Sequence, residues 1–255
     1  MLLDDSQFWS KGGVINFLLL CAALVAIAVN APAPAPDEEA DAVGQWLQQR
    51  ATQAVAQANP SPVGSYRIVR LADLDAPEAV KQQLRADIER SKGVVQVAEG
   101  GIPTQAEMLA ALPRTHRSAS ELRHRLPQPP STLEGSLLGP AEPIGMEPNG
   151  RLDGGKSSGL SRFYRLEGVG IVEFSENNFV AAGMQIEVIA EAQNTVVNGK
   201  PAHLGKVVVG AGRTRVELAW TGDSKTYSLT VTGEPGSDVE RNARVLHDIA
   251  EAIVD

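Results

Sequence analysis

The chain of 255 residues contains a single cysteine, Cys21, so it cannot close an intramolecular disulfide and its folded parts must rely on hydrophobic cores. Aromatic residues make up only 4% of the sequence, which limits stacking sites and argues against a sugar-binding cleft. Basic residues are the scarcer charge, because 23 Lys and Arg stand against 31 Asp and Glu, for a net charge of −8. This balance argues against nucleic acid as a partner of the whole chain.

One long run without charged residues occurs near the N-terminus, at residues 13–31. At about 1.5 Å per helical residue, this run is long enough to cross the hydrocarbon core of a bilayer. Alternating prolines from Pro32 to Pro36 stop a helix directly behind it. We therefore predict a transmembrane signal anchor, and the alternative is a signal peptide that is cleaved from the mature protein.

Basic residues near the run indicate its orientation. Lys11 precedes it, whereas the first basic residue after it is Arg50, and the acidic residues 37–39 come sooner. Under the positive-inside rule, residues 1–12 are cytoplasmic and the rest of the chain is exported. In a bacterium this predicts a single-pass protein of the inner membrane with a periplasmic C-terminal domain, or a soluble periplasmic protein if the run is cleaved.

The exported part is predicted to contain a proline-rich linker and amphipathic helix (32–60), a small α/β unit (61–125), a second linker (126–160) and a C-terminal domain (161–255). The amphipathic helix carries one apolar stripe around Trp46. This stripe either packs on the next domain or pairs with a second copy of the chain. The second linker is rich in proline and glycine, which disfavour a helix or a central strand.

The small unit has the pattern β-α-β-α. Short alternating stretches at residues 65–71 and 94–99 predict strands. Between them, apolar residues recur every four positions, at Val80, Leu84 and Ile88. Asp75 and Thr104 are the predicted N-caps of its two helices.

The C-terminal domain is predicted as an antiparallel sheet of about five strands covered by a C-terminal helix, so that the whole exported part is α+β. Residues 163–174 form one predicted strand and residues 184–192 the next. Ser237 and Glu240 match a capping box at the start of the last helix. The side chains of Val216, Leu218, Trp220, Tyr227, Leu229 and Val231 are expected to face this helix.

A basic cluster stands out in this acidic chain. It consists of Arg114, His116, Arg117, Arg123, His124 and Arg125. Such a patch can hold an anionic partner such as a lipid head group or a glycan phosphate, although a solvated helix face has the same composition.

Two further patterns suggest chemistry. Residues 150–157 match the phosphate-binding pattern G-x-x-x-x-G-K-S, but prolines precede the match and a predicted strand follows it, where nucleotide binding needs a strand and then a helix. His203 and His247 are the candidates for a hydrolase, without a G-x-S-x-G motif to support them. Glu173, Glu176, Glu187 and Glu191 lie on predicted strands, and most are expected to point outward.

The sequence therefore predicts a non-catalytic, membrane-anchored module that binds a protein partner in the periplasm, as an accessory of a secretion or envelope system or as an inhibitor or immunity protein. It assigns no catalytic residue, cofactor or metal. The alternatives are an envelope hydrolase that uses His203 or His247, and a spacer that binds anionic lipid or peptidoglycan through the basic cluster. Self-association through the anchor or the helix around Trp46 is a further expectation.

Overall fold

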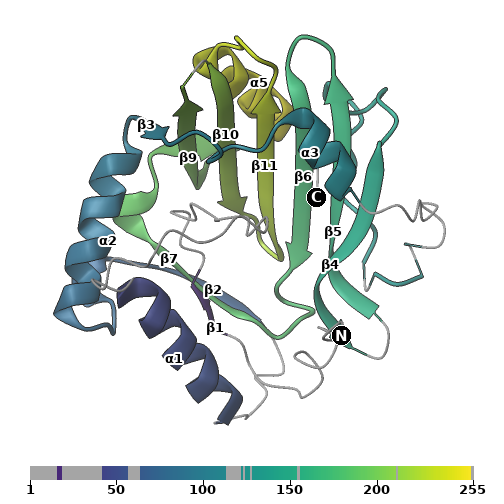
Figure 1. Cartoon of the computed structure of the whole chain (residues 1–255). Helices are drawn as coiled ribbons and strands as arrows, with labels where there is room; N and C mark the ends of the chain where they lie inside the picture. The colour runs from purple at the N-terminus through teal and green to yellow at the C-terminus, as the bar shows by residue number, and fades with distance from the viewer. Residues whose placement is uncertain are drawn as a thin grey trace, which may run out of the picture.

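The computed structural model of the chain describes residues 16–18, 42–56, 64–112, 122, 124–126, 128–153, 156–210 and 212–253. It is an α+β structure in which a large mixed sheet carries the C-terminal helix α5 (Val239–Glu251) on one face (Figure 1). The predicted class is confirmed at this level.

The large sheet has eight strands, in the order β3-β9-β10-β11-β6-β5-β4, with β8 as a second neighbour on the outer edge of β9. The strands are β3 (Val94–Val97), β4 (Gly145–Asp153), β5 (Lys156–Leu166), β6 (Gly170–Asn178), β8 (Thr195–Val197), β9 (Lys200–Val209), β10 (Arg213–Thr221) and β11 (Lys225–Gly233). Neighbouring strands run antiparallel, except that β3 is parallel to β9. Asn198 and Gly199 join β8 to β9 with φ of 48° and 76°, as expected for the tight turn that an Asn-Gly pair favours.

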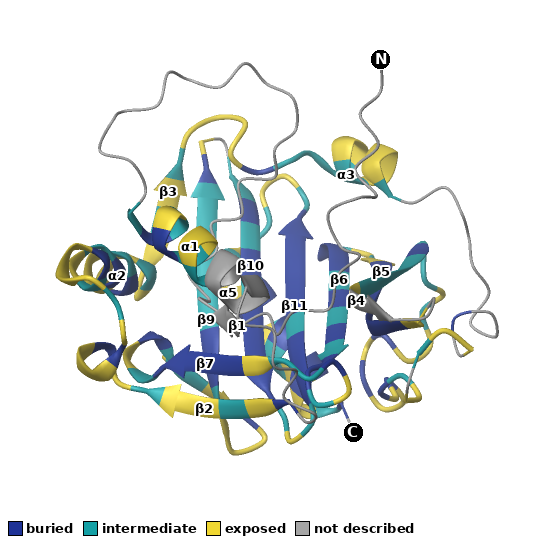
Figure 2. Cartoon of the chain, turned by 90° about the horizontal axis from the view of Figure 1, so that it is seen from below, coloured by how far each residue is buried: buried dark blue, intermediate teal, exposed yellow. Residues whose placement is uncertain are grey.

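A second, smaller sheet has three parallel strands in the order β1-β7-β2. They are β1 (Asn16–Leu18), β7 (Gln185–Ile189) and β2 (Ser65–Val69). The middle strand β7 is largely buried, whereas β2 has exposed and half-buried residues at the edge (Figure 2).

The predicted elements of the small unit are present, but its strands do not pair with each other. α2 (Glu78–Ser91) buries Val80, Leu84 and Ile88 as expected. However, β2 pairs with β7 and β3 pairs with β9, so both strands join the C-terminal region. Strands of four or five residues bury too little surface to form a sheet by themselves, and their alternation does not specify a partner.

Helix α1 (Ala42–Ala56) packs against α2 through the predicted apolar stripe. Val43 and Trp46 are buried in a hydrophobic cluster that also contains Leu84 and Ile88. Packing is therefore confirmed for the described part of this stripe, whereas self-association through the helix stays a prediction.

The expectation that residues 126–160 form only a linker is wrong for their second half. Residues 145–153 are the strand β4, and β5 begins at Lys156. β4 lies at the edge of the sheet, where a proline such as Pro148 is tolerated because its missing N–H need not serve a second neighbour. The first half of the segment, residues 128–143, has no long element and is called the strap below.

Two strand boundaries also differ from the prediction. Residues 163–174 do not form one strand, because a turn at residues 167–169 separates β5 from β6, with Gly168 at a φ of 68°. β7, predicted as the next strand of the meander, leaves the large sheet and pairs with β2 instead.

The main core lies between the large sheet and α5. The predicted inward residues of β10 and β11 are buried there and pair in register, as Val216 with Val231, Leu218 with Leu229 and Trp220 with Tyr227. The rings of Trp220 and Tyr227 stack at 5.0 Å between centroids. The strap adds Leu133 and Leu138 to the same core.

The caps of the helices differ in part from the prediction. Thr104 forms the predicted cap of α3 (Gln105–Ala111), as a capping box with Glu107. α2 begins after Pro77 without a cap from Asp75. α5 is capped by Asp238, whose side chain accepts from the backbone N–H groups of residues 240 and 241, while Ser237 bonds to Thr214.

Most of the predicted anchor lies outside the described residues. Its residues 16–18 are β1, which pairs with β7. These residues cannot pair with β7 and span a bilayer at the same time, so the anchor stays a prediction. Among the helices that the structure describes, none is long and apolar enough to cross a membrane.

The cap of α5 gives a test of this fold. Replacing Asp238 by Ala leaves two N–H groups of the first turn without an acceptor, so we expect a loss of about 1 kcal/mol in the free energy of unfolding. Urea unfolding followed by circular dichroism measures the loss. The matched control is Asp75→Ala, which removes no cap and is expected to leave the urea midpoint unchanged. An equal loss in both variants contradicts the assignment.

Candidate functional site

The large sheet has two unlike faces. α5 and the strap cover one, the helix face, with the apolar core beneath them. The opposite face is called the polar face, and the end of α3 lies over it, since Leu112 is next to Gly145 and Phe163. The polar face carries Glu147 and Asn149 (β4), Ser161 (β5), Glu173, Ser175 and Asn177 (β6), Ser228, Thr230 and Thr232 (β11), Arg215 and Glu217 (β10), and His203 (β9).

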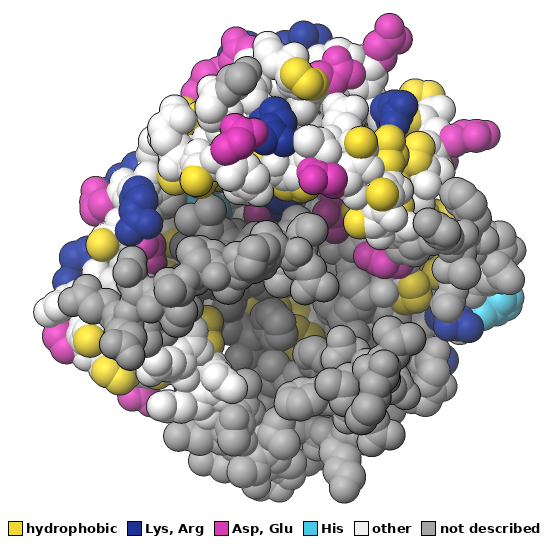
Figure 3. Space-filling model, viewed as in Figure 1, with side chains coloured by type: hydrophobic (Ala, Val, Ile, Leu, Met, Phe, Trp, Pro, Cys, Tyr) yellow, Lys and Arg dark blue, Asp and Glu magenta, His cyan; other side chains and the backbone are white. Residues whose placement is uncertain are grey.

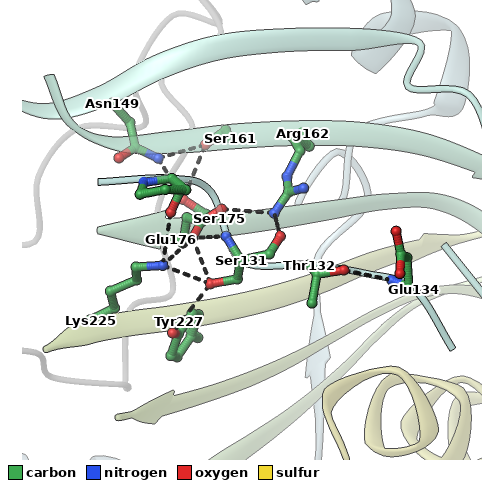
Figure 4. A network of polar contacts seen from close by, with 11 residues as sticks. Ser131, Thr132, Glu134, Asn149, Ser161, Arg162, Ser175, Glu176, Lys225 and Tyr227 are labelled. Atoms are coloured by element: carbon green, nitrogen blue, oxygen red, sulfur yellow. Dashed lines mark hydrogen bonds and ion pairs between the residues drawn. The ribbon is translucent and has the colours of Figure 1, made fainter. Parts of the chain in front are cut away.

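A buried ionic network lies on the helix face, where β6 and β11 meet the strap (Figure 4). Glu176, of which 4% is exposed, accepts hydrogen bonds from the backbone N–H of Ser131 at 2.9 Å and from its hydroxyl at 2.8 Å. Arg162 lies 2.7 Å and Lys225 3.2 Å from the same carboxylate. The Arg162 guanidinium also stacks over Phe174 at 4.9 Å and donates to the carbonyl of Ser131 at 3.1 Å. We call this set the Glu176 network.

The Glu176 network contains a hydroxyl and an amine in contact, which is an arrangement that some hydrolases use for catalysis. Lys225 Nζ lies 2.9 Å from Ser131 Oγ. A general base must be free to take the proton of the hydroxyl, but Lys225 is engaged in an ion pair with Glu176 at 3.2 Å. Ser131 is 3% exposed, and the cavity beside it has about 10 Å³, room for one water molecule. The network therefore holds the strap on the sheet.

The members of the network were missed in the sequence, although a signal was present. Arg162, Glu176 and Lys225 each stand two residues from an inward-facing aromatic ring on their strand, at Tyr164, Phe174 and Tyr227. A charged residue in phase with the apolar side of a strand must be paired when the strand is buried.

The polar face concentrates carboxyl groups whose pKa values are raised. Burial is the main cause for Glu147, Glu173 and Glu217. Arg215 partly offsets this effect, because its charge lowers the pKa of Glu173 and Glu217. The charge of Glu147 raises the pKa of Glu173, and the charge of Glu173 raises the pKa of Glu217. Glu173 and Glu217 lie in one register row, on either side of Thr230.

Hydrogen bonds of the polar face leave several oxygens unused. Asn149 donates to Ser161 Oγ at 2.9 Å and to Ser175 Oγ at 2.7 Å, which ties β4 to β5 and β6. Gly159 makes room for this amide, because a Cβ there would collide with it. Among the described residues, buried oxygens of Asn149, Asn177 and Thr232 have no hydrogen-bond partner.

The polar face is thus the described surface with the largest set of perturbed and unpartnered polar groups. No family model, curated protein or solved structure matches this chain. The surface must therefore be interpreted from its own chemistry, which is that of hydrogen-bond acceptors, carboxylates and the arginines Arg165, Arg213 and Arg215. Within the described residues, no group of three or more His, Cys, Asp or Glu has the arrangement of a metal site.

The two candidate histidines have different surroundings. His203 is buried, its Nδ1 lies 2.7 Å from the carbonyl oxygen of Ala192, and burial lowers its pKa, so the neutral ring donates this bond. His247 Nε2 lies 3.1 Å from Thr195 Oγ1. No carboxylate of the described residues forms a hydrogen bond or an ion pair with either ring. The residues beside His247 run around the solvent side of α5, so this surface is shallow.

The expectation that most strand carboxylates point outward is wrong for Glu176 and Glu187, which are buried. Glu187 on β7 forms ion pairs with Arg50 of α1, at 3.2 Å, and with Arg67 of β2. This carboxylate thereby joins three elements around the small sheet. Alternation alone missed this because β7 is covered on both sides.

Only part of the basic cluster can be placed. His124 and Arg125 are exposed, and the backbone of Arg125 bonds to Ser157 at the start of β5. Arg114, His116, Arg117 and Arg123 lie outside the described residues. The anionic partner of this patch stays a prediction.

The phosphate-loop match lies on the β4–β5 hairpin. Asp153 pairs with Lys156, and a strand follows, as the sequence predicts. Ser157 is buried, and its hydroxyl donates to the carbonyl oxygen of Gly159 at 3.1 Å. The N-terminus of a helix, which phosphate binding requires, does not follow this match.

The Glu176 network predicts a large loss of stability on truncation. Replacing Glu176 by Ala removes the carboxylate from two buried cations, so we expect the free energy of unfolding to fall by about 3–5 kcal/mol. Urea unfolding measures it. The control is Asp223→Asn, which breaks the exposed ion pair with Lys200 and is expected to leave the urea midpoint unchanged. A loss below about 1 kcal/mol for Glu176→Ala would show that the strap does not depend on this carboxylate.

For Glu217 on the polar face we expect a gain of stability on substitution, in contrast to the loss expected for Glu176. Since its pKa is raised above the ordinary value of 4.5, the native state binds its proton more tightly, and stability falls as pH rises from 4.5 through the native pKa. Glu217→Gln should therefore raise the urea midpoint at pH 7, and the difference should vanish below pH 4.5. A variant that is less stable at pH 7, or equally shifted at both pH values, refutes this.

Proposed function

We propose that the chain is a membrane-anchored, non-enzymatic module of the bacterial envelope that binds a protein partner in the periplasm. It serves a secretion or envelope system as an accessory, or neutralises a toxic enzyme as an inhibitor or immunity protein. The observation that carries the proposal is the polar face, where half-buried carboxylates and unpartnered oxygens remain on one side of an otherwise well-packed sheet. Perturbed groups that are not used for packing are typical of functional surfaces.

The charged side chains of this surface support a protein partner. In the view of Figure 1, α3 and the segment before it cross in front of the strands, so Figure 3, seen from the same side, looks toward the polar face. Acidic and basic side chains are mixed over the described part of this view. Small side chains, at Ser175, Ser228 and Ala219, form one register row of the sheet.

The rest of the described chain supplies fewer candidates for catalysis. The hydroxyl and amine of the Glu176 network are engaged in holding the strap. A hydrolase that uses His247 is the second candidate function, favoured by the bond to Thr195. It predicts that Thr195→Val abolishes hydrolysis of an ester substrate, whereas the binding module predicts no such activity in the unchanged chain.

Crosslinking in intact cells tests the proposed function. A photoreactive amino acid in place of Glu147 lies on the polar face, and one in place of Asp248 lies on the solvent side of α5. We expect a discrete crosslinked protein from position 147 and none from position 248. The full chain is needed, because β2 and β3 complete the sheets of the C-terminal region. Identical products from both positions, or none from position 147, would overturn the proposal.

A further inference from the structure

We propose that the edge of β7 on which β1 lies is an acceptor for an extended, apolar segment of the protein partner, which adds to the small sheet as a parallel strand. This inference rests on the proposed export and partner binding, and it names a second contact site and the form of the bound segment. Strand addition of this kind takes its affinity from main-chain hydrogen bonds and its specificity from the side chains that flank them.

Two structures compete for the residues of β1. In the small sheet, Asn16, Phe17 and Leu18 pair in parallel register with residues 185–187 of β7. The same three residues lie inside the uncharged run 13–31, which is predicted to be an anchor or a cleaved signal peptide. Insertion as a helix takes them out of the sheet, and cleavage removes them from the mature protein. In both cases β7 of the exported protein loses this neighbour.

β7 is poorly suited to be an edge strand. Four of its five residues are buried, and β2 already occupies its other side. Helix α1 lies beside β1 at the edge in question (Figure 1). A buried strand needs hydrogen-bond partners for the N–H and C=O groups on both of its sides. When β1 leaves, another extended segment is therefore required to satisfy these groups.

The surroundings of β7 define the chemistry of that segment. Ile186 and Val188 belong to a hydrophobic cluster with Phe179, and Ile189 belongs to the cluster that contains Trp46. Apolar clusters thus lie on both faces of β7, and a parallel strand that is covered on both faces is apolar along its whole length. β1 pairs with three of the five residues of β7, so a longer segment can cover the strand completely.

A second copy of the chain cannot supply this segment from its own β1. Its residues 16–18 are inserted in the membrane or cleaved for the same reason. The partner is therefore a different protein, and the bound part is an extended apolar stretch of about five residues, the length of β7.

Disulfide trapping in the full chain, reconstituted in phospholipid vesicles, tests whether β1 leaves β7. Gln185 is exposed, and it pairs in register with Asn16 on one side and with the exposed Ser65 of β2 on the other. In a Cys21→Ala background, one variant combines Asn16→Cys with Gln185→Cys. The matched control combines Ser65→Cys with Gln185→Cys. Directly paired residues of neighbouring strands are close enough for a disulfide.

We expect the control pair to form its disulfide about tenfold more completely than the pair of positions 16 and 185. Gel mobility with and without a reductant measures the two fractions. Equal formation of both disulfides would show that β1 stays in the sheet of the membrane-bound chain, and it would overturn the inference.

A peptide tests whether the edge accepts a strand from another molecule. The probe is a blocked peptide with the sequence of residues 14–20, a lysine at each end for solubility, and Asn16→Cys as its reactive position. It is mixed with the full chain that carries Cys21→Ala and Gln185→Cys. The control peptide also carries Phe17→Pro, which removes a main-chain donor and opposes strand pairing. The control chain carries Asp248→Cys, at an exposed position of α5, in place of the change at position 185.

We expect about tenfold more mixed disulfide at position 185 than with either control. Equal trapping at positions 185 and 248, or by the two peptides, overturns the inference. The proposed function has its own readout, the crosslink from position 147. If that crosslink is found and trapping at position 185 fails, the proposed function stands without strand addition, whereas a missing crosslink refutes the proposed function itself.

Discussion

At one end, the main sheet depends on the contacts of the Glu176 carboxylate. This carboxylate is nearly inaccessible to water, and it accepts from the backbone and the hydroxyl of one strap residue while it faces two cations. Without these partners the buried charge would be unstable, so the strap and the carboxylate require each other. The strap in turn places Leu133 and Leu138 in the core that α5 covers further along.

A second carboxylate has the same role in the smaller sheet. Glu187 holds α1 and β2 against β7, and the cluster around Trp46 and Leu84 fills the space between the helices. The ion pairs of Glu176 with Lys225 and of Glu187 with Arg50 each join segments that are more than 40 residues apart in the chain. The fold is therefore secured by long-range ion pairs where short strands and a proline-rich segment bury little apolar surface by themselves.

Local patterns in the sequence were sufficient to predict many of the helices, strands and turns, but not which strands pair with each other. The stripe of α5, the four-residue repeat in α2 and the Asn198-Gly199 turn each depend on neighbours within a few residues, and all three are present. Which strand β2 and β3 would join depends on contacts across more than 100 residues, which no local pattern encodes. Likewise, proline and glycine correctly indicated irregular chain at the strap but missed β4, since an edge strand tolerates Pro148.

The polar face was also hidden from the sequence, because its carboxylates become neighbours only after four strand pairings form, and one of these, β6 with β11, is not a hairpin. The two faces of the sheet now differ in a way that bears on function. On the helix face the buried charges of Arg162, Glu176 and Lys225 are paired, whereas on the polar face burial raises the pKa of Glu173 and Glu217. A protein near its stability threshold retains such carboxylates where they serve binding. Thus the removal of a carboxylate is expected to have opposite effects on the two faces, because Glu176 neutralises two buried cations, whereas Glu217 is buried without an ion pair in the described residues and is more favourable as the neutral amide at pH 7.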